Sequence, residues 1–419
     1  MKKTNKLTAL FMCVIMLVCT AGALPVFAEE TREAKQLRFG DDGKFKILML
    51  ADAQDTDEPE KETIDMINSA LDKTNPDLVV FLGDNIAGWW DGVDKGKTVK
   101  AIRNIIEPVD ERKIPFAVVF GNHDHEGLCD ENNGMTEEEA KEFMLSVYQE
   151  YPTCLAVEGE EMTGCGNYNL LIKNSAGTKD VFNLWMMDSN PYAEEGGYGY
   201  VQPDQTDYYI KTSNALKEAN GGAPLPSLLF QHIIVPEAYE LFEEHSSKVD
   251  GAVKGNSVRS DKYYTAGELV SDGELLEGPC PADIDHGQFD SWKQQGDIIG
   301  AFFGHDHNNT FAGQLDGIWL TAVPGTGYHS YGFNHGVRTI TLDENNLTSF
   351  ESEIILSNEL LDYEVKPDFK AKHGAAEYEN FKQNVIIGLS VGAVVLIVLA
   401  VVVAVVIKKK KKKIQEMSK

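Results

Sequence analysis

Short apolar runs that end in polar, often glycine-marked loops are the feature of this chain that most restricts its fold. They occupy residues 45–50, 78–82, 116–120, 181–187, 228–230 and 298–303. Continuous apolar runs of roughly five or six residues are typical of strands buried on both faces, as in layered α/β folds. The chain is therefore predicted to form a sheet that is covered on both sides.

Helical patterns separate the first three runs. In each, apolar residues recur on one helical face: Ile64, Ile67 and Leu71 in the first, and Val99, Ile102, Ile105 and Val109 in the second. The alternation of strand and helix predicts right-handed crossovers and a largely parallel sheet in this half. Residues 125–165, which favour a helix around 137–151, and residues 244–285 interrupt the alternation, and we expect both to be surface insertions near the mouth of a site.

Polar side chains follow five of the runs, at the point where each strand is predicted to end. They are Asp52 and Gln54, Asp84, Asn122, His232, and His305 and His307. Ligands in open α/β folds gather at the carboxyl ends of the strands. In extended backbone, residues two apart point to the same side, so each close pair can present two ligands to one point. A mixed carboxylate, amide and imidazole set suits Zn, Mn or Fe better than Ca.

Each of these signals has an ordinary alternative when taken alone. A single Gly-Asp-Asn is usually a turn, and a single histidine at a strand end is more often structural. Their joint occurrence, in order, at successive strand ends favours a metal centre. Four of the ten histidines fall in these loops: His123, His232, His305 and His307.

The ordered motifs resemble those of the calcineurin-like metallophosphoesterases. The resemblance rests on Asp52-Ala53-Gln54, Gly83-Asp84-Asn85, Gly121-Asn122-His123-Asp124, His232 and Gly304-His305-Asp306-His307. It extends over about residues 42–345, and Asp188-Ser189 and the stretch 325–338 look closest to the branch related to purple acid phosphatases. The resemblance implies a four-layer α/β/β/α sandwich, which we assign to residues 36–357.

The same resemblance implies the roles of the site residues. Two metal ions (Mn, Fe or Zn) would be bridged by Asp84, and a hydroxide shared between them would attack a phosphate ester. The first ion would take Asp52, Gln54 and His307, and the second Asn122, His232 and His305. His123, held by Asp124, would act as acid or charge stabiliser.

Two departures from the family's common pattern affect the first ion. Gln54 stands where histidine is commoner, so this ion is expected to bind more weakly. Ala87 stands where purple enzymes carry a tyrosine, so no tyrosinate-to-iron absorption band is expected.

Both ends of the chain carry export and anchoring signals. Residues 1–28 have a basic start, an apolar stretch and a small-residue cleavage site, as in a secretory signal peptide; Val18 before Cys19 disfavours a lipoprotein signal. Residues 385–407 carry no charge and precede six lysines, which predicts a transmembrane helix with the tail 408–419 in the cytoplasm. Residues 358–384 would form a stalk, and the catalytic domain would lie outside the membrane.

The net charge limits the expected partners, and the cysteines leave the question of disulfides open. The net charge is −28 although both ends are basic, so the domain between them repels polyanions, and no nucleic-acid partner is expected. A small phosphate ester is the expected substrate, and the sequence does not indicate an oligomeric state.

Four cysteines outside the signal peptide (Cys129, Cys154, Cys165 and Cys280) permit disulfides, but free thiols are about equally expected.

Three functions remain open. The first is hydrolysis of phosphomonoesters or phosphodiesters, and the second is hydrolysis of a nucleotide or diphosphate, for which Trp89 and Trp90 could stack on a base. Packing beneath a loop is the commoner role for such tryptophans. The third is a catalytically silent metal-binding module, which intact His123 and Asp124 disfavour. Four further histidines are weaker candidates for the pocket: His125, His286, His329 and His335.

Overall fold

The computed structural model describes residues 36–90, 92–194, 196–363 and 365. The predicted signal peptide, most of the stalk, the charge-free span 385–407 and the lysine-rich tail lie outside these residues. Among the helices of the described residues, none has the length and apolar content needed to cross a bilayer.

The first sheet has five strands and contains the first three apolar runs. Its order is β16 (Asn346–Leu356), β15 (Gly336–Asp343), β2 (Lys44–Leu50), β3 (Leu78–Leu82) and β4 (Phe116–Val119). β2, β3 and β4 are parallel, as predicted, whereas β15 pairs antiparallel with both β2 and β16. The carboxyl ends of the three parallel strands therefore meet at one edge of the sheet.

The second sheet has eight strands and contains the other three runs. Its order is β1 (Leu37–Arg38), β5 (Tyr168–Lys173), β6 (Asp180–Met186), β7 (Ser227–Phe230), β12 (Ile298–Phe303), β14 (Ile318–Ala322), β13 (Ala312–Leu315) and β11 (Val270–Asp272). β6, β7, β12 and β14 are parallel. The mixed α/β organisation predicted from the sequence is confirmed.

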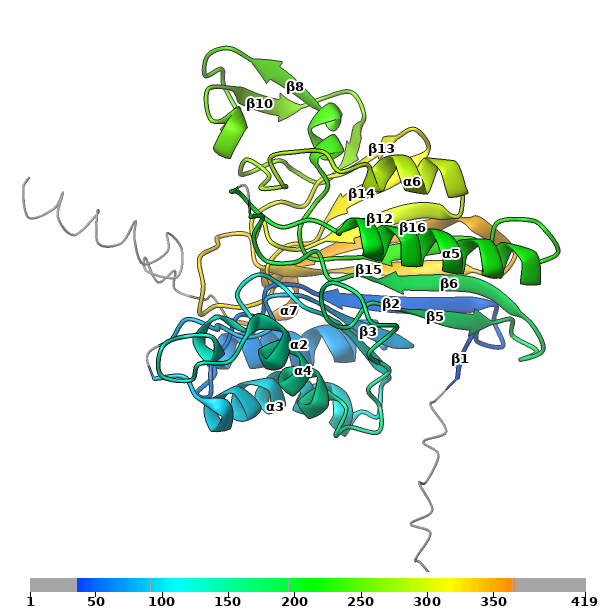
Figure 1. The fold of residues 1–419 in the computed structure, drawn as a ribbon, viewed down its shortest axis with the longest axis horizontal. Helices are drawn as coiled ribbons and strands as arrows, with labels where there is room; N and C mark the ends of the chain where they lie inside the picture. The colour runs from blue at the N-terminus through cyan, green and yellow to red at the C-terminus, as the bar shows by residue number, and fades with distance from the viewer. Residues whose placement is uncertain (1–35, 91, 195, 364, 366–419) are drawn as a thin grey trace, which may run out of the picture. The chain divides into compact units, whose positions relative to one another are not determined.

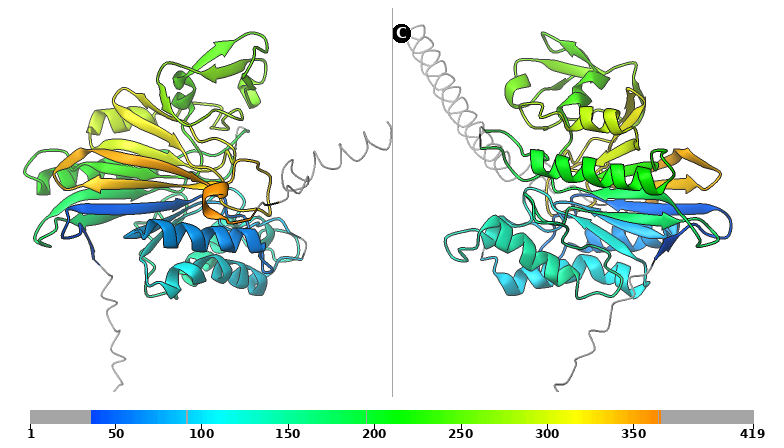
Figure 2. Two further views of the ribbon diagram at one scale, coloured as in Figure 1. Left: turned by 180° about the vertical axis from the view of Figure 1, so that it is seen from behind. Right: turned by 45° about the vertical axis from the view of Figure 1, so that its right-hand side comes forward.

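Helices cover the outer faces of the two sheets (Figures 1 and 2). α2 (Lys61–Thr74), α3 (Lys95–Glu111) and α4 (Glu137–Tyr148) lie beside the five-stranded sheet, and α5 (Pro203–Ala219) and α6 (Gln288–Gln295) lie beside the eight-stranded one. The short α7 (Ser357–Leu360) follows β16. The described residues also contain three 3-10 helices: η1 (Glu126–Leu128), η2 (Pro236–Leu241) and η3 (Ser257–Arg259).

The end of strand β6 and the residue after it, Met187, show why the central strands are apolar on both faces. Leu184 and Met186 belong to a core shared with the five-stranded sheet, whereas Trp185 and Met187 belong to a second core beneath α5 and α6. Successive side chains of a strand point to opposite faces. β6 is therefore buried on both faces of the eight-stranded sheet.

The two predicted insertions differ in their structural role. α4 begins with a capping box between Thr136 and Glu139, and it buries Ala140 and Met144 in the first core. It is part of the helical layer and not a surface insertion, because these apolar residues pack inward. Residues 244–285 contain most of a third, three-stranded sheet of β8 (Phe242–His245), β10 (Tyr263–Ala266) and β9 (Val253–Lys254).

Candidate metal centre

The loops after β2, β3 and β12 have left-handed backbone at four of the predicted ligands. The φ angles are 50° at Asp52, 47° at Asp84 and 72° at His305, and Gln54 has 39°. Our expectation of extended backbone at the close pairs was therefore wrong. Non-glycine residues in this region cost roughly 1–3 kcal/mol each and concentrate at functional sites. The turns aim the side chains at one another across the edge of the sheets.

Asp84 is in contact with groups from three other segments. Its Oδ2 accepts a hydrogen bond from Gln54 Nε2 at 2.8 Å and lies 3.3 Å from His232 Nε2. Its Oδ1 accepts the backbone N–H of His123 at 2.8 Å. These contacts place Asp84 between the groups predicted for the first ion and those predicted for the second.

Asp52 connects the two histidines that follow β12. Its Oδ2 accepts the N–H of His305 at 3.0 Å, and its Oδ1 lies 3.3 Å from His307 Nε2. The rings of His305 and His232 are 5.2 Å apart between centroids. Ligand atoms of Asp84, His232 and His305 all lie within 4.8 Å of one another.

Gly121 allows Asn122 to approach Asp84. A Cβ atom at Gly121 would lie 2.2 Å from Asp84 Oδ1, a distance that no side chain can tolerate. The glycine before Asn122 is thus required by close packing against the central carboxylate. The structure brings all seven predicted metal ligands to the same edge of the two sheets.

Four ligand atoms at this centre are buried without a hydrogen-bond partner among the described residues. They are Gln54 Oε1, Asn122 Oδ1, His232 Nε2 and His305 Nε2. Leaving a buried polar atom unsatisfied costs roughly 1–3 kcal/mol, so native structures rarely keep several together without a reason. Two oxygen atoms and two imidazole nitrogens, next to two carboxylates, form a donor set that fits Mn, Fe or Zn.

His123 is positioned by Glu126 and not by Asp124, which corrects the expected contact. His123 Nδ1 lies 2.8 Å from Glu126 Oε2, within η1. Asp124 is buried and accepts backbone N–H groups of Asn85 at 2.8 Å and Gly121 at 2.7 Å. Asp124 therefore joins the loop of Asp84 to that of Asn122, while Glu126 orients the ring.

The calcineurin-like phosphoesterase family model matches residues 45–309, which contain all of these groups. The chain belongs to the calcineurin-like phosphoesterase family. "Probable inactive purple acid phosphatase 28" of Arabidopsis thaliana is 30% identical over 71% of this chain and 74% of its own length. "Probable inactive purple acid phosphatase 14" of the same plant is 29% identical over 71% of this chain and 74% of its own length. "Phosphatase DCR2" of Saccharomyces cerevisiae is 31% identical over 49% of this chain and 37% of its own.

The protonation of the histidines at this centre depends on the neighbouring carboxylates. Burial alone would lower the pKa of His232, but the negative charge of Asp84 raises it to about 10. Burial also lowers the pKa of His307, but the negative charge of Asp52 outweighs this effect and raises the pKa to about 9. Burial lowers the pKa of His305, and the neighbouring His232 lowers it further. Because an imidazole must be neutral to bind a metal, a cation at this centre replaces protons.

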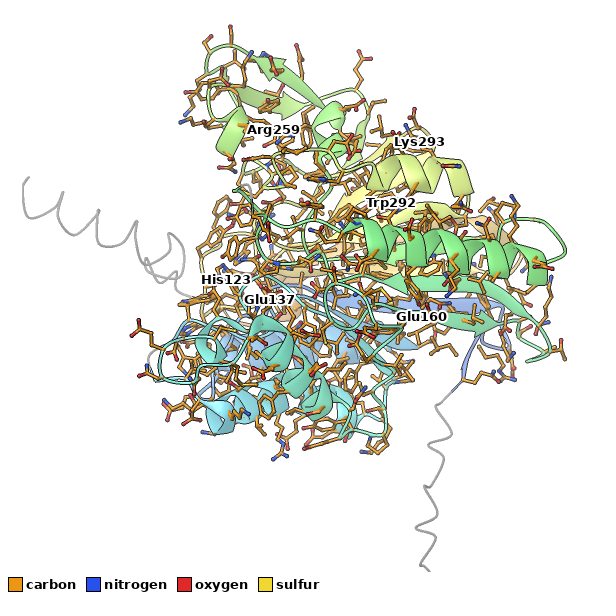
Figure 3. The ribbon with its side chains drawn as sticks, in the orientation of Figure 1. His123, Glu137, Glu160, Arg259, Trp292 and Lys293 are labelled. Atoms are coloured by element: carbon orange, nitrogen blue, oxygen red, sulfur yellow. The ribbon has the colours of Figure 1, made fainter. Side chains whose placement is uncertain are left out.

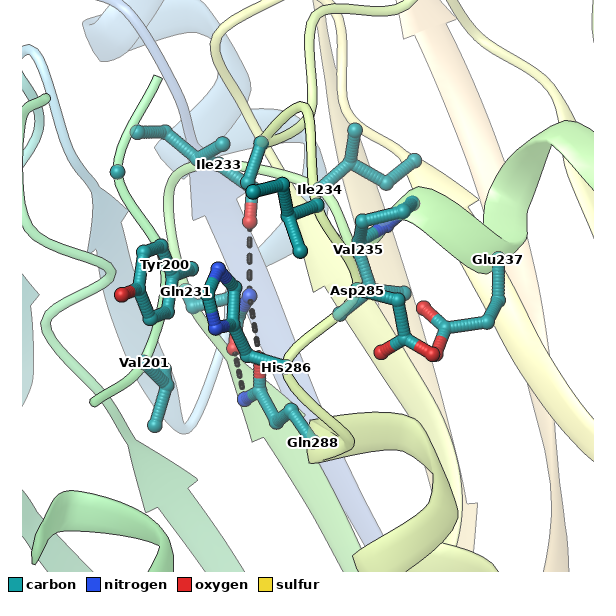
Figure 4. Close-up of a pocket in the computed structure, with 14 residues that line it drawn as sticks. Tyr200, Val201, Gln231, Ile233, Ile234, Val235, Glu237, Asp285, His286 and Gln288 are labelled. Atoms are coloured by element: carbon teal, nitrogen blue, oxygen red, sulfur yellow. Dashed lines mark hydrogen bonds between the residues drawn. The ribbon is translucent and has the colours of Figure 1, made fainter. Parts of the chain in front are cut away.

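The turn that carries His232 is held by amide side chains (Figure 4). Gln231 Nε2 donates to the carbonyl of Ile233 at 2.7 Å, and Gln231 Oε1 accepts from Gln288 Nε2 at 2.6 Å. The N–H of Ile233 donates to Ser189 Oγ at 3.0 Å. These bonds fix the backbone on both sides of His232, and they give Ser189 a role in supporting the turn.

Aromatic residues cover several of the candidate ligands, and the sequence reasoning missed most of them. Tyr198 packs edge-on against His305 at 4.3 Å between centroids, and Tyr331 stacks on His307 at 4.1 Å. Trp89 packs edge-on against His123 at 4.7 Å. Trp90 is partly buried against the first core, so of the two tryptophans only Trp89 lies at the site.

The remaining histidines contact other groups. His125 Nε2 lies 4.0 Å from Glu137, which Figure 3 labels at the start of α4 near His123. His286 stacks on a tyrosine, Tyr200, at 3.4 Å in the cavity of Figure 4, and His335 stacks on Tyr328 at 4.1 Å. His329 Nδ1 lies 3.9 Å from Glu60. Within the described residues, none of the four belongs to a group with metal-binding geometry.

One cysteine, Cys280, lies next to His305 of the metal centre, which the spacing of the cysteines in the sequence did not indicate. Within the described residues, none of the four cysteines forms a disulfide. Cys280 Sγ groups with ligand atoms of His305 and Asp306, within 4.8 Å of one another. The N–H of Cys280 donates to Asp306 Oδ1 at 3.1 Å, which holds this segment against the metal centre.

Proposed function

We propose that this chain is a metal-dependent phosphoesterase that hydrolyses phosphomonoesters or phosphodiesters on the outer side of a membrane. The observation that carries the proposal is the convergence around Asp84 of four buried ligand atoms without a hydrogen-bond partner, on Gln54, Asn122, His232 and His305. Two bound metal ions would supply positive charge for the phosphate oxygens and lower the pKa of a water molecule. Asp84 would bridge them.

The side chains named for each ion follow the two sides of Asp84. Asp52, Gln54 and His307 would hold the first, and Asn122, His232 and His305 the second. The chain itself supplies little positive charge for a phosphate, since its net charge is −28. Metal ions are therefore the natural source of that charge.

His123 is the proposed acid or charge stabiliser. Its Nδ1 is held by the carboxylate of Glu126, which leaves Nε2 for the substrate. The side chain is 33% exposed, so a substrate can reach it. A histidine in this position can donate a hydrogen bond to the phosphate or a proton to the leaving oxygen.

A membrane-anchored location is part of the proposal and rests on the sequence. The basic and apolar segments at residues 1–28 and 385–407 would export the domain and hold it by its C-terminal side. The strongly acidic domain would then face outward, with the lysine-rich tail inside.

A silent metal-binding module is the second candidate, because two of the relatives carry the words "probable inactive" in their names. The contact between His123 and Glu126 argues for activity, since a purely structural cage has no need of an oriented, exposed imidazole. The deciding experiment assays the chain, purified in mild detergent, with aryl phosphate and bis-aryl phosphate after loading with Mn, Fe or Zn. Turnover supports the enzyme, and absence of turnover in metal-loaded protein supports the module.

A further inference from the structure

Exposed aromatic side chains gather on the loops around the metal centre. Among the described residues, the large apolar side chains that remain exposed include four aromatic ones: Trp89, Tyr192, Phe333 and Tyr363. Trp89 contacts His123. Tyr192 contacts Glu126 and the predicted metal ligand Asn122. Phe333 donates its N–H to Asn308, the residue after His307, at 2.9 Å. Three of the four, Trp89, Tyr192 and Phe333, thus lie on loops beside the metal centre, and such a concentration of exposed rings at one site indicates contact with a ligand.

Trp89 is held rigidly beside His123. A Cβ atom at Gly88 would lie 1.8 Å from the backbone oxygen of His123, so the two loops are packed against each other without space for a side chain. The indole packs edge-on against the imidazole at 4.7 Å, yet it remains 42% exposed. A ring fixed in this way offers a surface to a ligand at little cost in conformational entropy.

Tyr192 lies on another side of the same histidine pair. Its hydroxyl donates to Glu126 Oε1 at 3.2 Å and lies 3.4 Å from Asn122 Nδ2. Its ring stacks on Tyr198, which covers His305, and it is 51% exposed. The backbone of Tyr192 also pairs with that of Tyr198, which fixes the loop.

A cavity of about 410 Å³ begins beside Tyr192. Pro191, Met162 and Glu137 are among its lining residues. Lys141 also lines it, but its amine is engaged by Asp188 at 2.7 Å and by Glu137 at 2.9 Å. The cavity is large enough for an organic group and has no uncommitted cation to attract a second phosphate.

We infer that the leaving group of the substrate is a planar aromatic ring that lies against Trp89 and Tyr192. This inference rests on the proposed phosphoesterase function. His123 would protonate the leaving oxygen, and both aromatic residues contact His123 or its partner Glu126, so the group attached to that oxygen is the part of the substrate that meets them. A ring can stack on an indole or phenol face, which a compact alkyl group cannot do.

The test compares binding of phenylphosphonate, methylphosphonate and butylphosphonate to the Mn-loaded full chain by calorimetry. These probes are not hydrolysed, so the result does not depend on turnover. Trp89→Ala should reduce the preference for the phenyl over the methyl probe by about 2- to 10-fold, the usual range for an aromatic pair. Tyr192→Leu should act in the same direction, whereas Tyr192→Phe, which keeps the ring, should preserve the preference.

Tyr363→Ala is the matched control, because this exposed ring contacts Lys61 and Asp65 on α2. It should leave the preference unchanged. An unchanged phenyl preference in Trp89→Ala and Tyr192→Leu would overturn the inference alone. So would an equal loss for the butyl probe, which would show apolar contact without selection of a planar ring. Failure of the metal-loaded wild type to bind any of the three phosphonates would overturn both this inference and the proposed function.

Discussion

Replacing Lys141 with methionine should destabilise the fold strongly, because its amine forms a buried ion pair with Asp188. The Lys141 and Asp188 side chains are each 1% exposed, and their charged atoms are 2.7 Å apart. Burial lowers the pKa of Lys141, but Asp188 and Glu137 outweigh it and raise the pKa above its usual value. The Lys141 amine is therefore protonated, and methionine would leave Asp188 buried without its cation.

The magnitude follows from that uncompensated charge. Removing one partner of a buried ion pair costs about 3–5 kcal/mol. Asp188 keeps two hydrogen bonds, from the N–H groups of Cys165 and Asn190, each at 2.9 Å, so we expect the lower half of this range. The assay is urea unfolding of the purified chain, followed by tryptophan fluorescence.

Lys211→Met is the control for this experiment. Lys211 pairs with Glu160 at 2.7 Å, but the two side chains are 66% and 61% exposed, so its loss should cost at most about 1 kcal/mol. Adding Asp188→Asn to Lys141→Met should recover part of the stability, because it removes the buried charge. Equal unfolding midpoints for Lys141→Met and Lys211→Met would refute the reasoning.

Three further predictions concern the site and the topology. His123→Ala should keep both metals while losing roughly 10²–10⁴-fold in hydrolysis rate. Glu126→Gln should lose less of the rate, because the His123 ring keeps a neutral hydrogen-bond partner. Loss of metal in His123→Ala would contradict the role assigned to His123. After dialysis against a weak chelator, wild type should fall toward one metal per chain, whereas Gln54→His should stay nearer two. The reason is that imidazole binds Zn and Fe more tightly than an amide does. The reverse order of metal content would refute the ranking of the two sites. Protease added to intact cells should remove the catalytic domain and protect 408–419, and a domain that is cut only after lysis would contradict export.

Much of the fold was predictable because burial on both faces leaves a direct trace in the sequence. Strands such as β3 (Leu78–Leu82) and β12 (Ile298–Phe303) are apolar at almost every position, and the ligands follow them at once. α4 was harder to place, because its acidic first turn reads as exposed although Ala140 and Met144 are buried. Packing of a helix against a distant segment is not encoded in its own periodicity alone.

The finer geometry of the site was not predictable for a related reason. Asp52 has left-handed backbone, and its carboxylate accepts a hydrogen bond from His305, which is more than 250 residues away in the chain. Glu126 was overlooked because Asp124, directly beside His123, was the nearer acid in sequence. Tyr192 and Tyr198 lie in a loop without periodicity, so no pattern indicated that they would cover the ligands.

One measurement tests the central claim most directly: metal content and hydrolysis of aryl and bis-aryl phosphate, determined on the same sample of the full chain and of Asp84→Ala. The account predicts that wild type loaded with Mn, Fe or Zn binds two ions and turns over at least one of the two esters. Asp84→Ala should lose metal and activity together, because the contacts of Asp84 place it between the two ligand groups. A folded wild-type chain that holds two ions and hydrolyses neither ester would contradict the account.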